Sequence, residues 1–128
     1  MNNKISRQVV GVRPVNIKWV VVRGDTSALK VQFLENDEET SYDITNWQFS
    51  ATAFSPKDQI FDDLEVSVDG NEITITASSD ITEFWGSGVS TTVAELDFDL
   101  EVQVSRDTIW TPIVGTITVV GDVTGGRL

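Results

Sequence analysis

Apolar and polar residues alternate along much of this chain of 128 residues. The alternating segments are residues 15–22, 29–33, 47–53 and 95–104, and a longer segment rich in apolar residues covers 109–120. A period of two places side chains on opposite faces of a strand, so each segment reads as a strand with one buried face. No segment carries the period of a long helix. The pattern predicts about seven to nine short strands.

Short polar segments separate these strands. Asp69-Gly70-Asn71 divides two strand-like segments and is a strong hairpin signal. Arg23-Gly24-Asp25 is an adhesion ligand in other proteins, but here it sits between two strands and is expected to be a tight turn. Residues 60–64 fit a short strand or a single turn. Residues 78–86 fit one helical turn, capped by Ser79 or Asp80, or an irregular crossover.

Many short strands with frequent turns are typical of an all-β fold. The sequence predicts an antiparallel immunoglobulin-like β-sandwich with an extended N-terminal arm; a closed barrel shows the same alternation and remains open. We expect three parts. Residues 1–22 form a basic arm with a possible added strand, residues 23–122 form the sandwich, and residues 123–128 form a flexible, Gly-rich tail.

The charge is strongly negative and unevenly distributed. The net charge is −11, yet residues 1–23 contain five basic side chains and no acid, which leaves −16 on the remaining residues. An acidic body argues against binding nucleic acid through its phosphates. The basic segment is either a solvated tail or an arm that lies on an acidic surface, for example that of a neighbouring copy.

Residue types limit the chemistry. The chain has no histidine and no cysteine, which removes the Ser-His-Asp and Cys-His nucleophile schemes, the usual zinc sites and disulfides. No apolar run approaches the ~20 residues of a membrane-spanning helix, and no secretory signal core follows Met1. We therefore expect a protein that is not an enzyme and has no cofactor, no metal and no contact with a membrane.

Four acidic side chains share one face of the strand over residues 95–104: Glu95, Asp97, Asp99 and Glu101. Neighbours on that face lie ~7 Å apart. Carboxylates at such spacing could flank a glycosidic bond or help to hold calcium. The apolar residues between them indicate instead an ordinary strand with a solvent-facing side, which is the favoured interpretation.

The four tryptophans differ in expected role. Trp19 and Trp47 lie in alternating strands and are expected in the core. Trp85, in a connection, either plugs one end of the fold or protrudes into an interface, where Trp is enriched. Trp110 follows a turn and fits both roles. The predicted partner-binding set combines the last two tryptophans with six residues of the arm. Its members are Arg7, Val9, Val10, Val12, Arg13, Val15, Trp85 and Trp110.

Several short motifs resemble one known family. They are Gly24-Asp25-Thr26 before a strand, Asp43-Ile44-Thr45, "EITIT" over 72–76, "LDFDLEV" over 96–102 and "GTITVVGDVT" over 115–124. Across residues 20–124 this layout resembles the immunoglobulin-like domain at the N-terminus of upper baseplate proteins of tailed bacteriophages, and related small prophage structural domains.

The resemblance implies a non-enzymatic virion structural protein that packs into a symmetric assembly. Its partners would be other virion proteins and copies of itself, and its position could be in the tail or baseplate, the neck, a fibre connector or a capsid decoration. The arm valines could anchor this packing or add a strand to a neighbour's sheet. The alternative function is a carbohydrate- or receptor-binding β-sandwich module, with Trp85 or Trp110 in its site.

Overall fold

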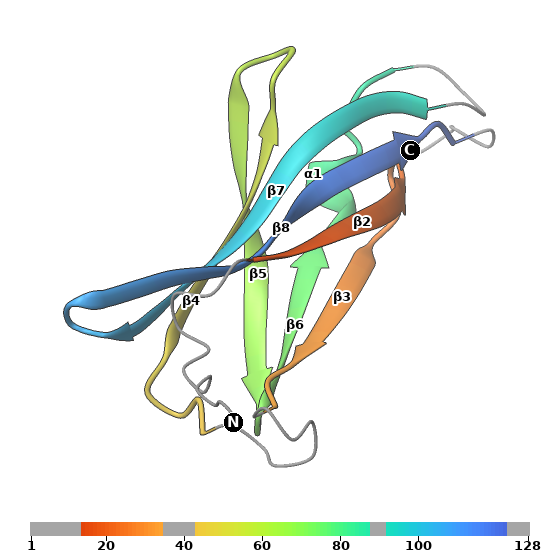
Figure 1. Cartoon of the computed structure of the whole chain (residues 1–128). Helices are drawn as coiled ribbons and strands as arrows, with labels where there is room; N and C mark the ends of the chain where they lie inside the picture. The colour runs from red at the N-terminus through yellow and green to blue at the C-terminus, as the bar shows by residue number, and fades with distance from the viewer. Residues whose placement is uncertain (1–13, 35–42, 88–91, 123–128) are drawn as a thin grey trace.

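A computed structural model describes residues 14–34, 43–87 and 92–122. These residues form seven strands and one short helix (Figure 1). The elements are β2 (Val15–Val22), β3 (Ser27–Gln32), β4 (Gln48–Ser55), β5 (Ile60–Asp69), β6 (Glu72–Ala77), α1 (Ser79–Thr82), β7 (Thr92–Ser105) and β8 (Thr108–Val120). The prediction of an all-β fold is therefore confirmed. The helix is shorter than two turns, and no helix in the described part of the chain is long and apolar enough to cross a membrane.

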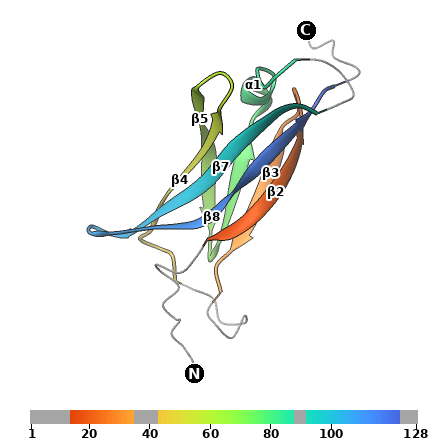
Figure 2. The same cartoon turned by 45° about the horizontal axis from the view of Figure 1, so that its top comes forward.

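The strands form one mixed sheet in the order β2-β8-β7-β4-β5-β6-β3. Strand β2 runs parallel to β8, and every other neighbouring pair is antiparallel. The sheet bends round until β2 and β3, the two ends of this order, approach each other at the turn that joins them (Figures 1 and 2). The result is a nearly closed barrel rather than two clearly separate antiparallel sheets.

Strand β5 explains why the sheet is continuous. Its first half, residues 60–64, pairs with β4, and its second half, residues 65–69, pairs with β6. The segment whose conformation the sequence left open is thus the start of a ten-residue strand. Because β5 pairs with β4 along one half and with β6 along the other, it joins these two strands into one continuous sheet.

The segment from Val15 to Val22, expected to belong to an arm, is a strand of the domain's own sheet. All eight of its residues pair in register with β8, from Ile113 to Val120. Trp19 and Val21 are buried in the core, and the Trp19 ring packs edge-on against Phe98 with centroids 5.5 Å apart. The rest of the predicted arm, residues 1–13, and the predicted tail, residues 123–128, lie outside the described residues.

The core lies between the facing parts of the sheet. Strand β7 contributes the alternate residues Leu96, Phe98, Leu100 and Val102, all buried. From the opposite side β6 contributes Ile73, Ile75 and Ala77, which are fully buried. Burial of such side chains drives folding by removing apolar surface from water. The alternation predicted along residues 95–104 is confirmed in β7.

The Arg23-Gly24-Asp25 segment is the turn between β2 and β3, as predicted. Gly24 has φ = 89°, a conformation that favours glycine. The buried hydroxyl of Thr82 in α1 accepts a hydrogen bond from Gly24 N–H at 3.0 Å and donates one to the Asp25 carbonyl at 2.7 Å. The helix therefore anchors the turn. Its N-cap is Ser78, without a side-chain capping bond, and not Ser79 or Asp80 as expected.

Candidate interaction surface

The two tryptophans of the predicted partner-binding set are both buried. Trp85 is 4% exposed and donates its indole N–H to an Asp62 carboxylate oxygen at 2.9 Å. It therefore plugs one end of the core, which is the first of the two roles that the sequence allowed. Trp110 is 7% exposed and packs edge-on against Trp47, with centroids 6.2 Å apart. Neither indole offers a face to solvent.

The remaining members of the set have different outcomes. Val15 begins β2 and is 62% exposed, so it is accessible to a partner. Arg7, Val9, Val10, Val12 and Arg13 lie outside the described residues. Of the three described members, Val15 and Trp110 line the same groove, whereas Trp85 lines a different pocket.

The largest exposed apolar side chains gather instead around the hairpin of β4 and β5. This hairpin extends beyond the strands beside it (Figure 1). Phe54 and Phe61 pair across it, with ring centroids 4.5 Å apart and planes tilted by 32°. Phe61 is 70% exposed, and Ile60, on the other face of the same strand, is 52% exposed.

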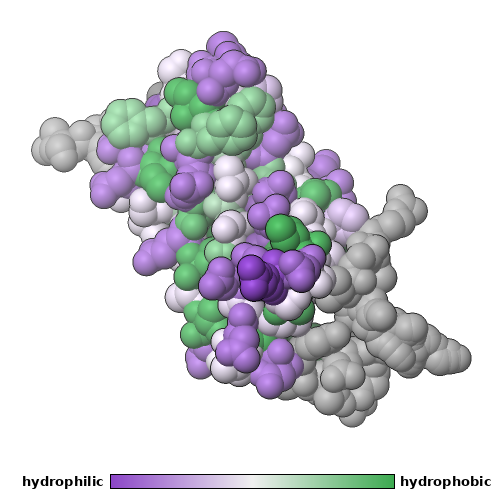
Figure 3. Space-filling view, turned by 90° about the vertical axis from the view of Figure 1, so that its left-hand side faces the viewer, coloured by the Kyte–Doolittle hydropathy of each residue, from purple (hydrophilic) through white to green (hydrophobic). Residues whose placement is uncertain are grey.

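Phe84, at the end of the helical segment, completes this group and is 78% exposed. It lines a pocket of about 190 Å³ together with Ile60 and Trp85. We define the hairpin patch as Phe54, Ile60, Phe61 and Phe84. Hydrophobic side chains are seen together at the end of the molecule where the β4–β5 hairpin lies (Figure 3). An exposed apolar group of this kind marks an interaction site more often than a random surface does.

The sequence analysis did not predict the hairpin patch, although one feature of the sequence indicates exposed apolar residues there. Ile60 and Phe61 are adjacent in the sequence. Adjacent residues of a strand point to opposite faces, so a core on one side cannot bury both. Residues 60–64 fitted both a strand and a turn, and the argument that one of the two adjacent side chains must be exposed holds only for a strand.

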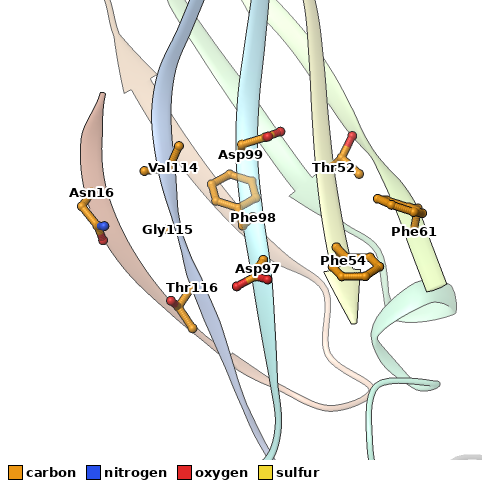
Figure 4. A pocket seen from close by; sticks show the side chains of 10 residues that line it. All are labelled: Asn16, Thr52, Phe54, Phe61, Asp97, Phe98, Asp99, Val114, Gly115 and Thr116. Atoms are coloured by element: carbon orange, nitrogen blue, oxygen red, sulfur yellow. The ribbon is translucent and has the colours of Figure 1, made fainter. Parts of the chain in front are cut away.

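The outer face of β2, β8, β7, β4 and β5 contains a shallow groove of about 420 Å³ beside the Phe54–Phe61 pair. Its polar side chains come from four neighbouring strands: Asn16, Thr116, Asp97, Asp99 and Thr52 (Figure 4). Burial, and then the negative charge of Glu101, raise the pKa of the Asp99 carboxyl above its ordinary value. The groove is thus acidic along its centre and aromatic at one end.

The acidic side chains of β7 point to solvent, as the favoured interpretation predicted. The structure shows one further contact on this face, a hydrogen bond of 3.2 Å from the Thr118 hydroxyl to Glu95. Within residues 14–34, 43–87 and 92–122, no three His, Cys, Asp or Glu side chains are placed to hold a metal ion. No protein-family model and no curated protein matches this chain.

Proposed function

We propose that this protein is a non-enzymatic structural protein that packs into a symmetric assembly, with copies of itself among its partners. The hairpin patch is the observation that carries the proposal. Fully burying a side chain such as phenylalanine stabilises a complex by about 1.5–3 kcal/mol relative to leaving it exposed. Phe61 and Phe84, each more than two-thirds exposed, have that gain still available.

The residue composition supports assembly over catalysis. Histidine and cysteine are absent from the whole chain, so its surface offers neither of the side chains that most often act as base or nucleophile near neutral pH. A projecting hairpin with apolar side chains on both faces suits packing instead, since it can enter a depression on a neighbouring subunit.

A tailed-phage virion is the setting that we propose, and it is supported by the resemblance of residues 20–124 to phage immunoglobulin-like domains. We also propose an immunoglobulin-like relationship for the fold. In that view β2, β8, β7, β4 and the first half of β5 form one layer, and β3, β6 and the second half of β5 form the other. The change of partner within β5 supports this division.

The test is sedimentation velocity on the full chain over a wide range of concentration. The parent protein should form a defined oligomer as concentration rises, and Phe61→Ser should shift the association to a higher concentration. Ile109→Ser is the matched control, because Ile109 is also an exposed apolar residue, 60% accessible, but lies next to the β7–β8 turn. Equal effects of the two substitutions, or a parent that is monomeric throughout, would contradict the proposal.

Carbohydrate binding is the second candidate, and the groove on the outer face is the observation that favours it. An aromatic pair beside carboxylate and amide groups offers both stacking and hydrogen bonding to a sugar. This version of the hypothesis moves the site from Trp85 and Trp110, which are buried, to Phe61 and Asp97. It predicts saturable binding on a glycan array that Asp97→Asn abolishes while the fold is kept. A blank array would count against it.

A further inference from the structure

A second surface lies where the sheet fails to close. Strands β2 and β3 are the ends of the strand order, so each has one edge that pairs with no other described strand. A groove of about 430 Å³ lies at this seam, and its walls are mostly apolar: Val15, Ile17, Leu29, Val31, Trp110 and Ile113. An unpaired strand edge is a template for another extended segment.

One of the residues that line the groove, Trp110, has a polar atom without a hydrogen-bond partner among the described residues. This atom is the indole nitrogen, and it is buried. A buried donor without an acceptor destabilises the structure, and most buried polar groups are paired. Because this nitrogen is not accessible to solvent, the N–H lies inside the wall of the groove rather than on its open face. Apolar walls and strand edges that pair with no other described strand together describe a site for an extended peptide segment.

We propose that this groove receives residues 5–13 of a neighbouring copy as an added strand. That segment carries the apolar side chains Ile5, Val9, Val10 and Val12. Extended, residues 5–13 reach about 30 Å. The six residues of β3 extend about 20 Å. The segment is therefore long enough to run the full length of the edge.

Charge favours the same occupant. The segment and its flank contain Lys4, Arg7 and Arg13 and no acid. Lys30 also lines the groove, so the complementary charge comes from the protein as a whole: the residues after Arg23 carry a net charge of −16. Two copies of so acidic a protein repel each other at long range, and a basic segment placed on the acidic body of a neighbour reduces this repulsion.

The source is a neighbour rather than the same chain because of Pro14. Residues 1–13 precede β2, which forms one side of the groove, so the chain would have to reverse around Arg13 and Pro14 to enter its own seam. A proline restricts the residue before it to extended conformations, which disfavours that reversal. The mode of binding is strand addition to a sheet edge.

Cysteine cross-linking of the full chain tests this, since the chain has no cysteine of its own. Val9→Cys, Val10→Cys and Val12→Cys are each mixed with Gln32→Cys, which reports on the groove. Ala28→Cys is the matched control, because Ala28 is also an exposed residue of β3 but does not line the groove. Mass labelling of one variant identifies the disulfide-linked heterodimers.

We expect cross-linking to Gln32→Cys at least about ten-fold faster than to Ala28→Cys, because docked thiols meet at a raised effective concentration. Successive residues of a strand face opposite sides. Either Val9→Cys or the pair Val10→Cys and Val12→Cys should therefore react, but not all three.

Equal rates at Gln32 and Ala28 would overturn the proposal. So would a monomeric double variant, Val10→Cys with Gln32→Cys, that closes an internal disulfide while the mixed single variants form no heterodimer, because the segment would then occupy its own groove. The inference rests on the proposed assembly role but uses a different surface. Unchanged association of Phe61→Ser together with preferential cross-linking at Gln32 would count against the hairpin patch alone. Weakened association of Phe61→Ser together with equal cross-linking at Gln32 and Ala28 would count against the groove alone.

Discussion

Replacing Thr82 by valine tests how the β2–β3 turn is held in place. Valine keeps the shape of the side chain and removes the hydroxyl, which at present joins Gly24 N–H and the Asp25 carbonyl to α1. Thr82 is fully buried. A buried donor that loses its partner costs about 1–3 kcal/mol, and a typical hydrogen bond contributes about 1 kcal/mol more. We expect Thr82→Val to lower the free energy of unfolding by about 2–4 kcal/mol.

The assay is equilibrium unfolding in urea, followed by tryptophan fluorescence. Thr26→Val is the matched control: the Thr26 hydroxyl also joins the turn to the helical segment, by accepting from Ser79 N–H at 3.2 Å, but at an exposed position. The control should cost no more than about 0.5 kcal/mol, as surface substitutions usually do. If the two substitutions cost the same, the hydroxyl of Thr82 does not anchor the turn.

Two further predictions concern the sheet that carries the proposed surfaces. Gly115→Ala should destabilise the protein by about 1–3 kcal/mol and speed amide exchange in β2, because the new Cβ would clash with the Ile17 carbonyl oxygen. Gly70→Ala, strained only by its φ of 65°, should leave exchange in β2 unchanged, and equal exchange in both variants would refute this reasoning. Asp99→Asn should be more stable than the parent at neutral pH. The folded protein holds the Asp99 proton more tightly than the unfolded chain does, so the parent loses stability as pH rises through the raised pKa. The advantage should disappear below the ordinary pKa of 3.8, and a pH-independent difference in urea unfolding would contradict this explanation.

The strands and their buried faces could be predicted from the sequence because alternation is a local property. The pairing partners could not. The parallel contact of β2 with β8 depends on Gly115, which lets the Ile17 backbone come close, and nothing in the local pattern of either segment shows this. Likewise, Thr82 looked like an ordinary residue of a helical turn, and only the fold brings it to a turn that precedes it by more than fifty residues.

The interaction surface was less predictable than the fold. Trp85 was a reasonable interface residue on composition alone, yet an acceptor distant in sequence, Asp62, lets its indole bury completely. The exposure of Phe61 could not be predicted because its segment fitted both a strand and a turn. Exposure depends on which face of a strand meets the core, and this is decided by partners that the local pattern does not reveal.

Hydrogen exchange of the full chain at low and high protein concentration tests the central claim most directly, because it locates an interface without any substitution. If the protein assembles through the hairpin patch, peptides that cover residues 54–61 should gain protection as concentration rises. Peptides that cover the β7–β8 turn, residues 105–108, should not change. Unchanged exchange of residues 54–61 at concentrations where the protein associates would contradict the account.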